Sequence, residues 1–176
     1  MTRITAWIQT FAAAALLAGC ASIEHAPSLK FSCTEKWVVL PMSNYSEAPH
    51  AGKAAEKLVE NVLLSRGLPD LFANPGQEEG AEYNSIQKQY DKALDWARGQ
   101  NARYGVTGAV TEWRYKSGVD GEPAVGMTLQ IVDVESAKVI WSAGGAKSGW
   151  SRDALSGVAQ DLIRDLLKSA SISCRG

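Results

Sequence analysis

The sequence is poor in the residues on which most enzyme chemistry depends. It contains only two histidines, His25 and His50, and neither lies in a recognisable catalytic arrangement. It has no glycine-rich loop of the kind that cradles phosphate, and residues 148–151 lack the spacing of a serine nucleophile elbow. We therefore predict that the protein is not an enzyme and uses no cofactor.

The sequence also lacks an excess of charge of either sign. The chain has 18 Lys and Arg residues against 19 Asp and Glu residues, and the basic residues are scattered rather than gathered on one stretch. This balance argues against nucleic acid as a partner and provides no polybasic patch for a membrane surface. The three cysteines form no CxxC pair, so the sequence suggests neither redox catalysis nor a metal site.

Long apolar runs are absent after the N-terminus, where the sequence instead carries a short secretory pattern. Arg3 precedes an apolar run at residues 12–17, which is too short for a convincing membrane-spanning helix. Residues 17–20 (LAGC) resemble a lipobox, which predicts that Cys20 is acylated and becomes the new N-terminus. An ordinary signal peptide with a chance cysteine is the alternative. Ala21 is not the aspartate that commonly retains lipoproteins at the inner membrane, so we expect anchoring to the outer membrane on its periplasmic face.

These observations divide the chain into a signal peptide (residues 1–19), a lipidated tether (20–35) and a single periplasmic domain (36–176). In an oxidising compartment, Cys33 and Cys174 either form a disulfide that staples the two ends of the domain or remain a free pair. A bridge that closes so long a loop would stabilise the fold by roughly 2–5 kcal/mol.

The first half of the domain has the periodicity of one strand and two helices. Residues 36–42 form a short apolar run that we expect to end at Pro41 as a buried strand. Apolar residues at helical spacing predict a helix over 54–63, ended by residues 67–69 (GLP). Residues 70–82 read as a loop with at most one short strand, and residues 81–100 as a second helix.

The second half alternates with period two and predicts three strands, at residues 103–115, 125–132 and 138–143. Short turns between them indicate an antiparallel meander. A glycine-rich segment follows at 144–150, and residues 151–153 open a final amphipathic helix. The predicted fold class is an α/β (α+β) sandwich, in which helices cover a mixed sheet that includes the meander.

Two features of this half are candidate functional sites. The turn at residues 118–123 places Asp120 and Glu122 between two strands; such acids are either an ordinary solvated turn or, repeated around a ring of subunits, a field that attracts cations. Trp150 lies in a glycine-bounded segment before the last helix. It either fills a corner of the core or lies at a membrane interface, which suits both the apolar ring and the indole N–H.

Residues 104–126 (YGVTGAVTEWRYKSGVDGEPAVG) and 141–152 (WSAGGAKSGWSR) resemble the PelC family of outer-membrane lipoproteins that serve Pel exopolysaccharide export. The resemblance spans most of residues 36–170 in order. It implies a fold similar to the CsgG-like and TolB N-terminal class.

The resemblance further implies a dodecameric periplasmic ring beneath the PelB outer-membrane barrel, guiding a partly deacetylated, cationic exopolysaccharide toward that barrel. Asp120 stands where the family motif places an acidic pore residue, with Glu122 as a weaker companion. Trp150 and Arg152 stand where the family shows a membrane-proximal belt.

Two other functions remain compatible with the sequence. A structural or assembly lipoprotein would stabilise a secretion complex, with the acids incidental. A CsgG-type secretion channel would need long amphipathic strands that cross the membrane, of about 9–11 residues each, and this chain has only a short hairpin to spare.

Acylation at Cys20 leads to the first testable prediction. Cys20→Ser should leave the domain folded and yet disrupt polymer export, because the lipid holds each subunit in one plane at the membrane. The amount of secreted polymer measures export, membrane fractionation measures anchoring, and circular dichroism of the purified variant measures folding. Normal export by a variant that has left the membrane fraction would contradict it.

Overall fold

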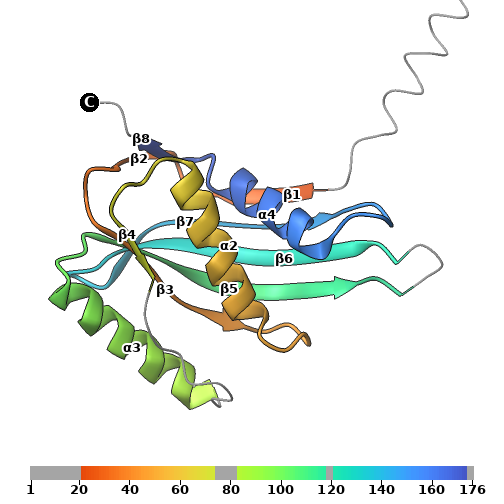
Figure 1. The fold of residues 1–176 in the computed structure, drawn as a ribbon, viewed down its shortest axis with the longest axis horizontal. Coiled ribbons are helices and arrows are strands. Elements are labelled where there is room, and N and C mark those ends of the chain that lie inside the picture. The colour runs from red at the N-terminus through yellow and green to blue at the C-terminus, as the bar shows by residue number, and fades with distance from the viewer. Residues whose placement is uncertain (1–20, 74–82, 118–120, 174–176) are drawn as a thin grey trace, which may run out of the picture.

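The computed structural model describes residues 21–73, 83–117 and 121–173, which form a six-stranded sheet, a two-stranded sheet and three helices (Figure 1). The strand order in the large sheet is β1-β7-β6-β5-β3-β4. Its strands are β1 (Ala21–His25), β3 (Trp37–Asn44), β4 (Leu71–Ala73), β5 (Tyr104–Tyr115), β6 (Pro123–Asp133) and β7 (Lys138–Ser148). The small sheet pairs β2 (Leu29–Ser32) with β8 (Ala170–Ser173).

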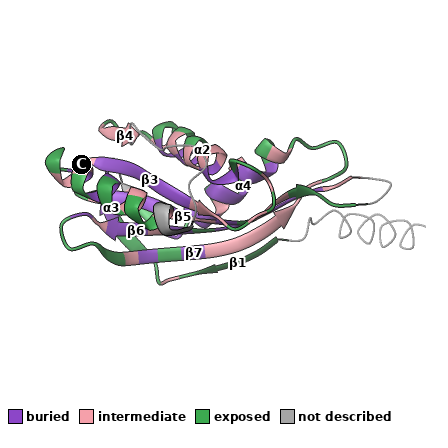
Figure 2. Cartoon of the chain, turned by 90° about the horizontal axis from the view of Figure 1, so that it is seen from below, coloured by how far each residue is buried: buried purple, intermediate pink, exposed green. Residues whose placement is uncertain are grey.

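The predicted fold class is confirmed. Strands β5, β6 and β7 form the expected antiparallel meander, while β3 runs parallel to both β4 and β5, so that the sheet is mixed. Helices α2 (Ala51–Ser65) and α4 (Leu155–Leu166) lie side by side on one face of the sheet (Figure 2). Helix α3 (Tyr83–Gly99) packs on the other face.

Strand β3 belongs to both layers of the core. Trp37 and Val39 are buried in the cluster beneath α2 and α4, while Val38 and Leu40 are buried in the cluster beneath α3. Successive side chains of a strand point to opposite faces, so a strand covered on both faces is apolar at every position. This two-sided burial explains the uninterrupted apolar run at the start of the domain.

The expectation that this strand ends at Pro41 is wrong, because β3 continues to Asn44. The pairing of β3 with β5 shifts register between Val39 and Met42, which marks a bulge around the proline. Proline has no N–H to donate to a ladder, and a bulge tolerates that loss. The Pro41 carbonyl accepts a hydrogen bond from Thr107 Oγ1 at 2.6 Å, and Glu56 accepts one from the Met42 N–H at 2.8 Å.

The third strand of the meander is longer than predicted. β7 continues through the glycine-rich segment to Ser148, because β1 pairs with it from Ala143 to Lys147. A Cβ on Gly145 would lie 2.5 Å from the Ser22 carbonyl oxygen. The glycine therefore permits the close approach of β1, and the final helix begins only at Leu155.

The segment expected to be a tether is instead built into the two sheets. β1 occupies an edge of the large sheet, and β2 pairs in parallel with β8 from Leu29 to Ser32. Phe31 of β2 packs edge-on against Trp37 and Tyr104, with ring centroids 5.9 and 5.4 Å away. The described fold therefore includes the residues that directly follow the predicted acylation site.

Cys33 lies at the end of this N-terminal region and is disulfide-bonded. It is buried and belongs to the core beneath α2 and α4. Its predicted partner, Cys174, lies outside the described residues. The described pairing of β2 with β8 ends with Ser32 opposite Ser173, one residue before each cysteine of the predicted pair. The pairing of the two cysteines stays a prediction.

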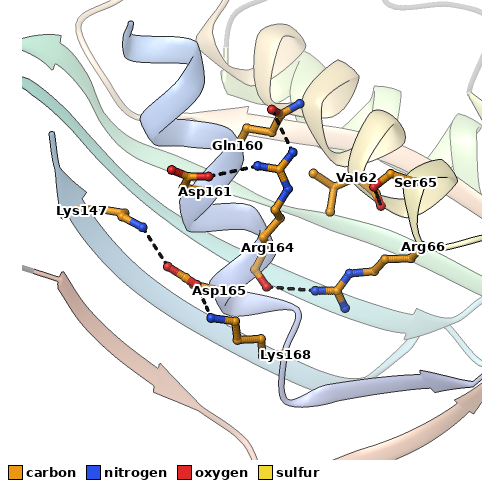
Figure 3. Close-up of polar contacts among 9 residues, drawn as sticks. All are labelled: Val62, Ser65, Arg66, Lys147, Gln160, Asp161, Arg164, Asp165 and Lys168. Atoms are coloured by element: carbon orange, nitrogen blue, oxygen red, sulfur yellow. Dashed lines mark hydrogen bonds and ion pairs between the residues drawn. The ribbon is translucent and has the colours of Figure 1, made fainter. Parts of the chain in front are cut away.

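The C-terminal end of α4 is held to its neighbours by polar contacts (Figure 3). The Arg66 guanidinium, just after α2, donates hydrogen bonds to the carbonyl oxygens of Arg164 and Leu167 at 2.9 and 2.8 Å. These carbonyls have no partner within the last turn of the helix, and a cation is favourable there. Burial and the nearby Arg164 lower the pKa of Arg66 from its usual value.

Asp165 links the same helix to the sheet. It accepts hydrogen bonds from Lys168 at 2.6 Å and from Lys147 of β7 at 3.0 Å. The bond from Lys168 is the main cause that holds the pKa of Asp165 below its usual value, opposed by partial burial and assisted by Lys147. Asp165 therefore stabilises the fold in its charged form.

This contact gives a pH-dependent prediction. Asp165→Asn should lower the free energy of unfolding at pH 7 by roughly 1 kcal/mol, since the charged hydrogen bonds to both lysines are lost. The wild-type carboxylate contributes its stability above the unfolded-state pKa of about 3.9 and loses it as the pH falls through the lower folded-state pKa. The difference between wild type and variant should therefore shrink below about pH 4.

Urea unfolding across pH 2.5–7 measures this difference, and Asp161→Asn is the matched control. Asp161 is on the same helix and pairs with Arg164 at 3.0 Å, but its side chain is well exposed. Its removal should change the free energy of unfolding by less than about 0.5 kcal/mol. A deficit in Asp165→Asn that is the same at every pH would refute the assignment.

Candidate functional site

One end of the large sheet gathers the predicted functional segments. The register places Ala21 of β1 beside Lys147 of β7, and Tyr115 of β5 beside Pro123 of β6. The Gly149 N–H donates to the Pro123 carbonyl at 2.9 Å and so brings the end of β7 next to the start of β6. The start of β1, the end of β7, the end of β5 and the start of β6 thus share one end of the molecule (Figure 1), which we call the hairpin end.

A compact corner at the hairpin end sets the position of Trp150. The Trp150 N–H donates to the Asp153 carboxylate at 2.8 Å, and the Asp153 N–H donates to the Trp150 carbonyl at 2.9 Å. A Cβ on Gly149 would lie 2.5 Å from Val158 Cγ2 and 2.8 Å from the Asp153 carboxylate. Only glycine fits this corner without a shift of its neighbours, so the chain leaves β7 along a defined path.

The Trp150 side chain lies on the surface, with 57% of it exposed. This exposure excludes the interpretation that Trp150 fills a corner of the core. Arg152, two residues further on, is also exposed and makes no hydrogen bond or ion pair with any other described residue. Both side chains are therefore free to meet a surface outside the subunit.

The acidic turn is described only in part. Asp120 lies outside the described residues, whereas Glu122 follows Gly121, which has a positive φ of 51°. The Glu122 carbonyl accepts a hydrogen bond from the Lys116 N–H at 2.7 Å, and its carboxylate lies 3.8 Å from Lys116 Nζ. The nearby ammonium group partly offsets the charge of Glu122.

Tyr115 is a further surface aromatic at the hairpin end, 53% exposed. Its hydroxyl accepts a hydrogen bond at 3.2 Å from the N–H of Leu155, the first residue of α4. The first N–H groups of a helix have no partner within the helix, so this contact ties the end of β5 to the start of α4. Cys20 lies outside the described residues; in the sequence it precedes Ala21, the first residue of β1.

Sequence reasoning missed a surface hollow between the β3–α2 loop and the last residues of β5. Its volume is about 790 Å³, and residues 45–48 and 111–114 line it. The hollow brings together Tyr45, Trp113, Glu47 and Glu112. In the sequence, the only signal for it is the aromatic residue Trp113 close to the acidic turn, because nothing local to residue 45 indicates its neighbours on β5.

Two kinds of site are absent from the described part of the chain. In residues 21–73, 83–117 and 121–173, no three or more His, Cys, Asp or Glu side chains are grouped so that they could hold a metal ion. Within the same residues, no helix is long and apolar enough to cross a membrane.

Comparisons with known proteins show a strong similarity to solved PelC structures. No family model matches the chain, and no curated protein matches it. Among solved structures, a PelC dodecamer from Paraburkholderia phytofirmans is 40% identical, with a TM-score of 0.74, and the match covers 88% of this chain and 99% of that one. A point variant of that dodecamer gives 40% identity and a TM-score of 0.76, with 88% and 100% covered.

A more distant structure shares only the fold. Lipoprotein GNA1162 from Neisseria meningitidis is 14% identical, with a TM-score of 0.50, and the match covers 76% of this chain and 95% of that one. At this identity the likeness concerns the arrangement of helices and strands alone.

The exposure of Trp150 gives a prediction that separates its role from folding. Trp150→Ala should change the free energy of unfolding by less than about 0.5 kcal/mol, because an exposed side chain loses few contacts. Trp141→Ala, at a position that is 1% exposed, should cost about 3–5 kcal/mol by the same measurement. Chemical denaturation of the purified variants tests both, and a large loss in Trp150→Ala would show that this residue supports the fold.

Proposed function

This chain belongs to the PelC family, and on that basis we propose that it is an outer-membrane lipoprotein of a Pel polysaccharide export system. In this proposal, copies of the chain form a periplasmic ring that guides a cationic exopolysaccharide toward an outer-membrane barrel of the PelB type. The observation that carries it is the 40% identity to the PelC dodecamer over 88% of the chain. The protein acts without chemistry of its own, by position and charge.

The dodecameric state of the relatives supports the ring. A closed ring repeats every surface feature of one subunit around a single axis. An acidic turn that is unremarkable on one copy then becomes a band of negative charge around an opening. Such a band raises the local concentration of a cationic chain, and its many weak contacts allow that chain to slide.

The hairpin end supports a defined orientation at the membrane. β1 begins at the residue after Cys20, so an acyl chain on that cysteine would hold the hairpin end close to the bilayer. Trp150 and Arg152 are exposed at the same end. An indole suits the interfacial region of a bilayer, and a guanidinium suits its anionic headgroups.

The guiding role predicts a loss of polymer flux when the acids of the turn are neutralised. Asp120→Asn combined with Glu122→Gln should reduce secreted polymer several-fold at an unchanged level of lipoprotein, because the band of charge then disappears. Glu122→Gln alone should have a smaller effect, since Lys116 already lies 3.8 Å from that carboxylate. Secreted polymer is measured by its amino-sugar content.

Asp161→Asn is the control, because it removes one exposed acid from the middle of α4 rather than from the turn. Full secretion by the double variant would refute the guiding role. A fall in the level of the barrel protein on deletion of this chain, with normal secretion in the double variant, would support the alternative of a structural or assembly lipoprotein.

A further inference from the structure

The hollow beside Tyr45 and Trp113 lies at an open edge of the sheet. Strand β3 pairs with β5 only as far as Asn44 opposite Val110, and the Tyr45 N–H adds one more bond to the Val110 carbonyl at 2.8 Å. Beyond that point β5 continues to Tyr115 with β6 on one side and no described strand on the other. The hollow of about 790 Å³ occupies this vacant side.

The walls of the hollow are held in place before any ligand arrives. Trp113 is half-buried and packs against the core beneath α2 and α4, as does Ala48. The Asn44 side chain donates to the Ala48 carbonyl at 2.8 Å and accepts from the N–H and hydroxyl of Ser46 at 3.0 and 2.7 Å. Binding therefore needs little ordering of the loop, which lowers its entropic cost.

The two aromatic side chains offer complementary surfaces. The indole of Trp113 is fixed by the core, whereas Tyr45 is 58% exposed. An exposed tyrosine presents an apolar ring with a hydroxyl that can both donate and accept hydrogen bonds. Aromatic faces also attract ammonium groups within about 6 Å of the ring.

The charged groups of the hollow favour a cation. Glu47 is exposed and forms no ion pair with the other described residues, while Glu112 pairs with Arg114 at 2.9 Å. The hollow thus carries two carboxylates against one guanidinium.

A second hollow, of about 530 Å³, lies against β1, β6 and β7 and is lined by small and polar residues without any Trp, Tyr or Phe.

We propose that the Tyr45–Trp113 hollow is a binding subsite for amino-sugar residues of a cationic polysaccharide. A pyranose ring has apolar C–H faces that pack on aromatic rings, hydroxyls that bond to polar side chains, and, when deacetylated, an ammonium group for Glu47. The subsite rests on the proposed export function and extends it, because each subunit would hold the polymer through contacts to sugar rings in addition to the field of the acidic turn. A volume of about 790 Å³ accommodates a short segment of the chain.

Direct binding tests the subsite in the full mature chain carrying Cys20→Ser, which removes the acylation site. The probes are a glucosamine pentasaccharide, which is cationic, the neutral N-acetylglucosamine pentasaccharide, and spermidine, a cation without sugar. Isothermal titration should show binding of the cationic pentasaccharide, weaker binding of the neutral one, and weaker binding still of spermidine. The preference for the cationic sugar should fall as salt is added.

Tyr45→Ala should weaken binding of the glucosamine pentasaccharide roughly fivefold, as expected for the loss of one aromatic contact of about 1 kcal/mol. Glu47→Gln should weaken binding of the cationic pentasaccharide and leave binding of the neutral one unchanged. Trp150→Ala is the matched control, since it removes an equally exposed aromatic outside the hollow. Equal binding by wild type and Tyr45→Ala, or equal loss in Trp150→Ala, overturns the subsite.

A second copy of this chain is the competing occupant, because the open edge of β5 could pair with a strand. If Tyr45→Ala alters the mass of the assembly while sugar binding is unchanged, the hollow is an interface between copies and the subsite is wrong. Loss of secretion in the acidic-turn variant together with no sugar binding by wild type would overturn the subsite alone. Tyr45-dependent sugar binding with full secretion by that variant would support the subsite and refute the guiding role of the turn.

Discussion

Burial of β3 on both faces is the constraint from which the rest of the architecture follows. Trp37 and Val39 need the layer of α2 and α4, and Val38 and Leu40 need α3. An internal strand that is apolar on both faces, as β3 is between β4 and β5, is stable only when both faces are removed from water. This requirement places all three described helices where they can cover the sheet. It leaves the hairpin end, where β5 and β7 finish and β6 begins, available for contacts outside the subunit.

Much of the fold could be predicted because the relevant signals are local. Period-two alternation identifies β5, β6 and most of β7, and helical spacing identifies α2 and α4, whose apolar stripes face one buried cluster. The missed strands carry no such signal. All five residues of β1 are exposed, and its pairing depends on glycines in β7 that lie more than a hundred residues away. The end of β3 is predicted too early, at Pro41, for a related reason. A bulge is defined by the pairing with the partner strand, which the local sequence does not show.

The candidate site likewise has parts with a local sequence signal and parts without one. The glycine before Trp150 and the acids of the β5–β6 turn can be read from short stretches, so both attracted attention in the sequence. The Tyr45–Trp113 hollow cannot, because its walls are brought together only where β3 stops beside β5. The sequence likewise leaves open whether Trp150 lies in the core or on the surface. Its exposure depends on how the corner at Gly149 packs against Val158, which the local sequence does not show.

The antiparallel pairing of β1 with β7 has a mechanical consequence. Five consecutive residues of β1 face β7, and a pull on Ala21 along the strand axis acts on all of these pairs at once. Such a pull loads the hydrogen bonds in shear, so they must break together rather than one after another. The start of the domain is therefore strong against tension along β1 and weak against peeling away from the sheet edge, so it resists force best in one direction.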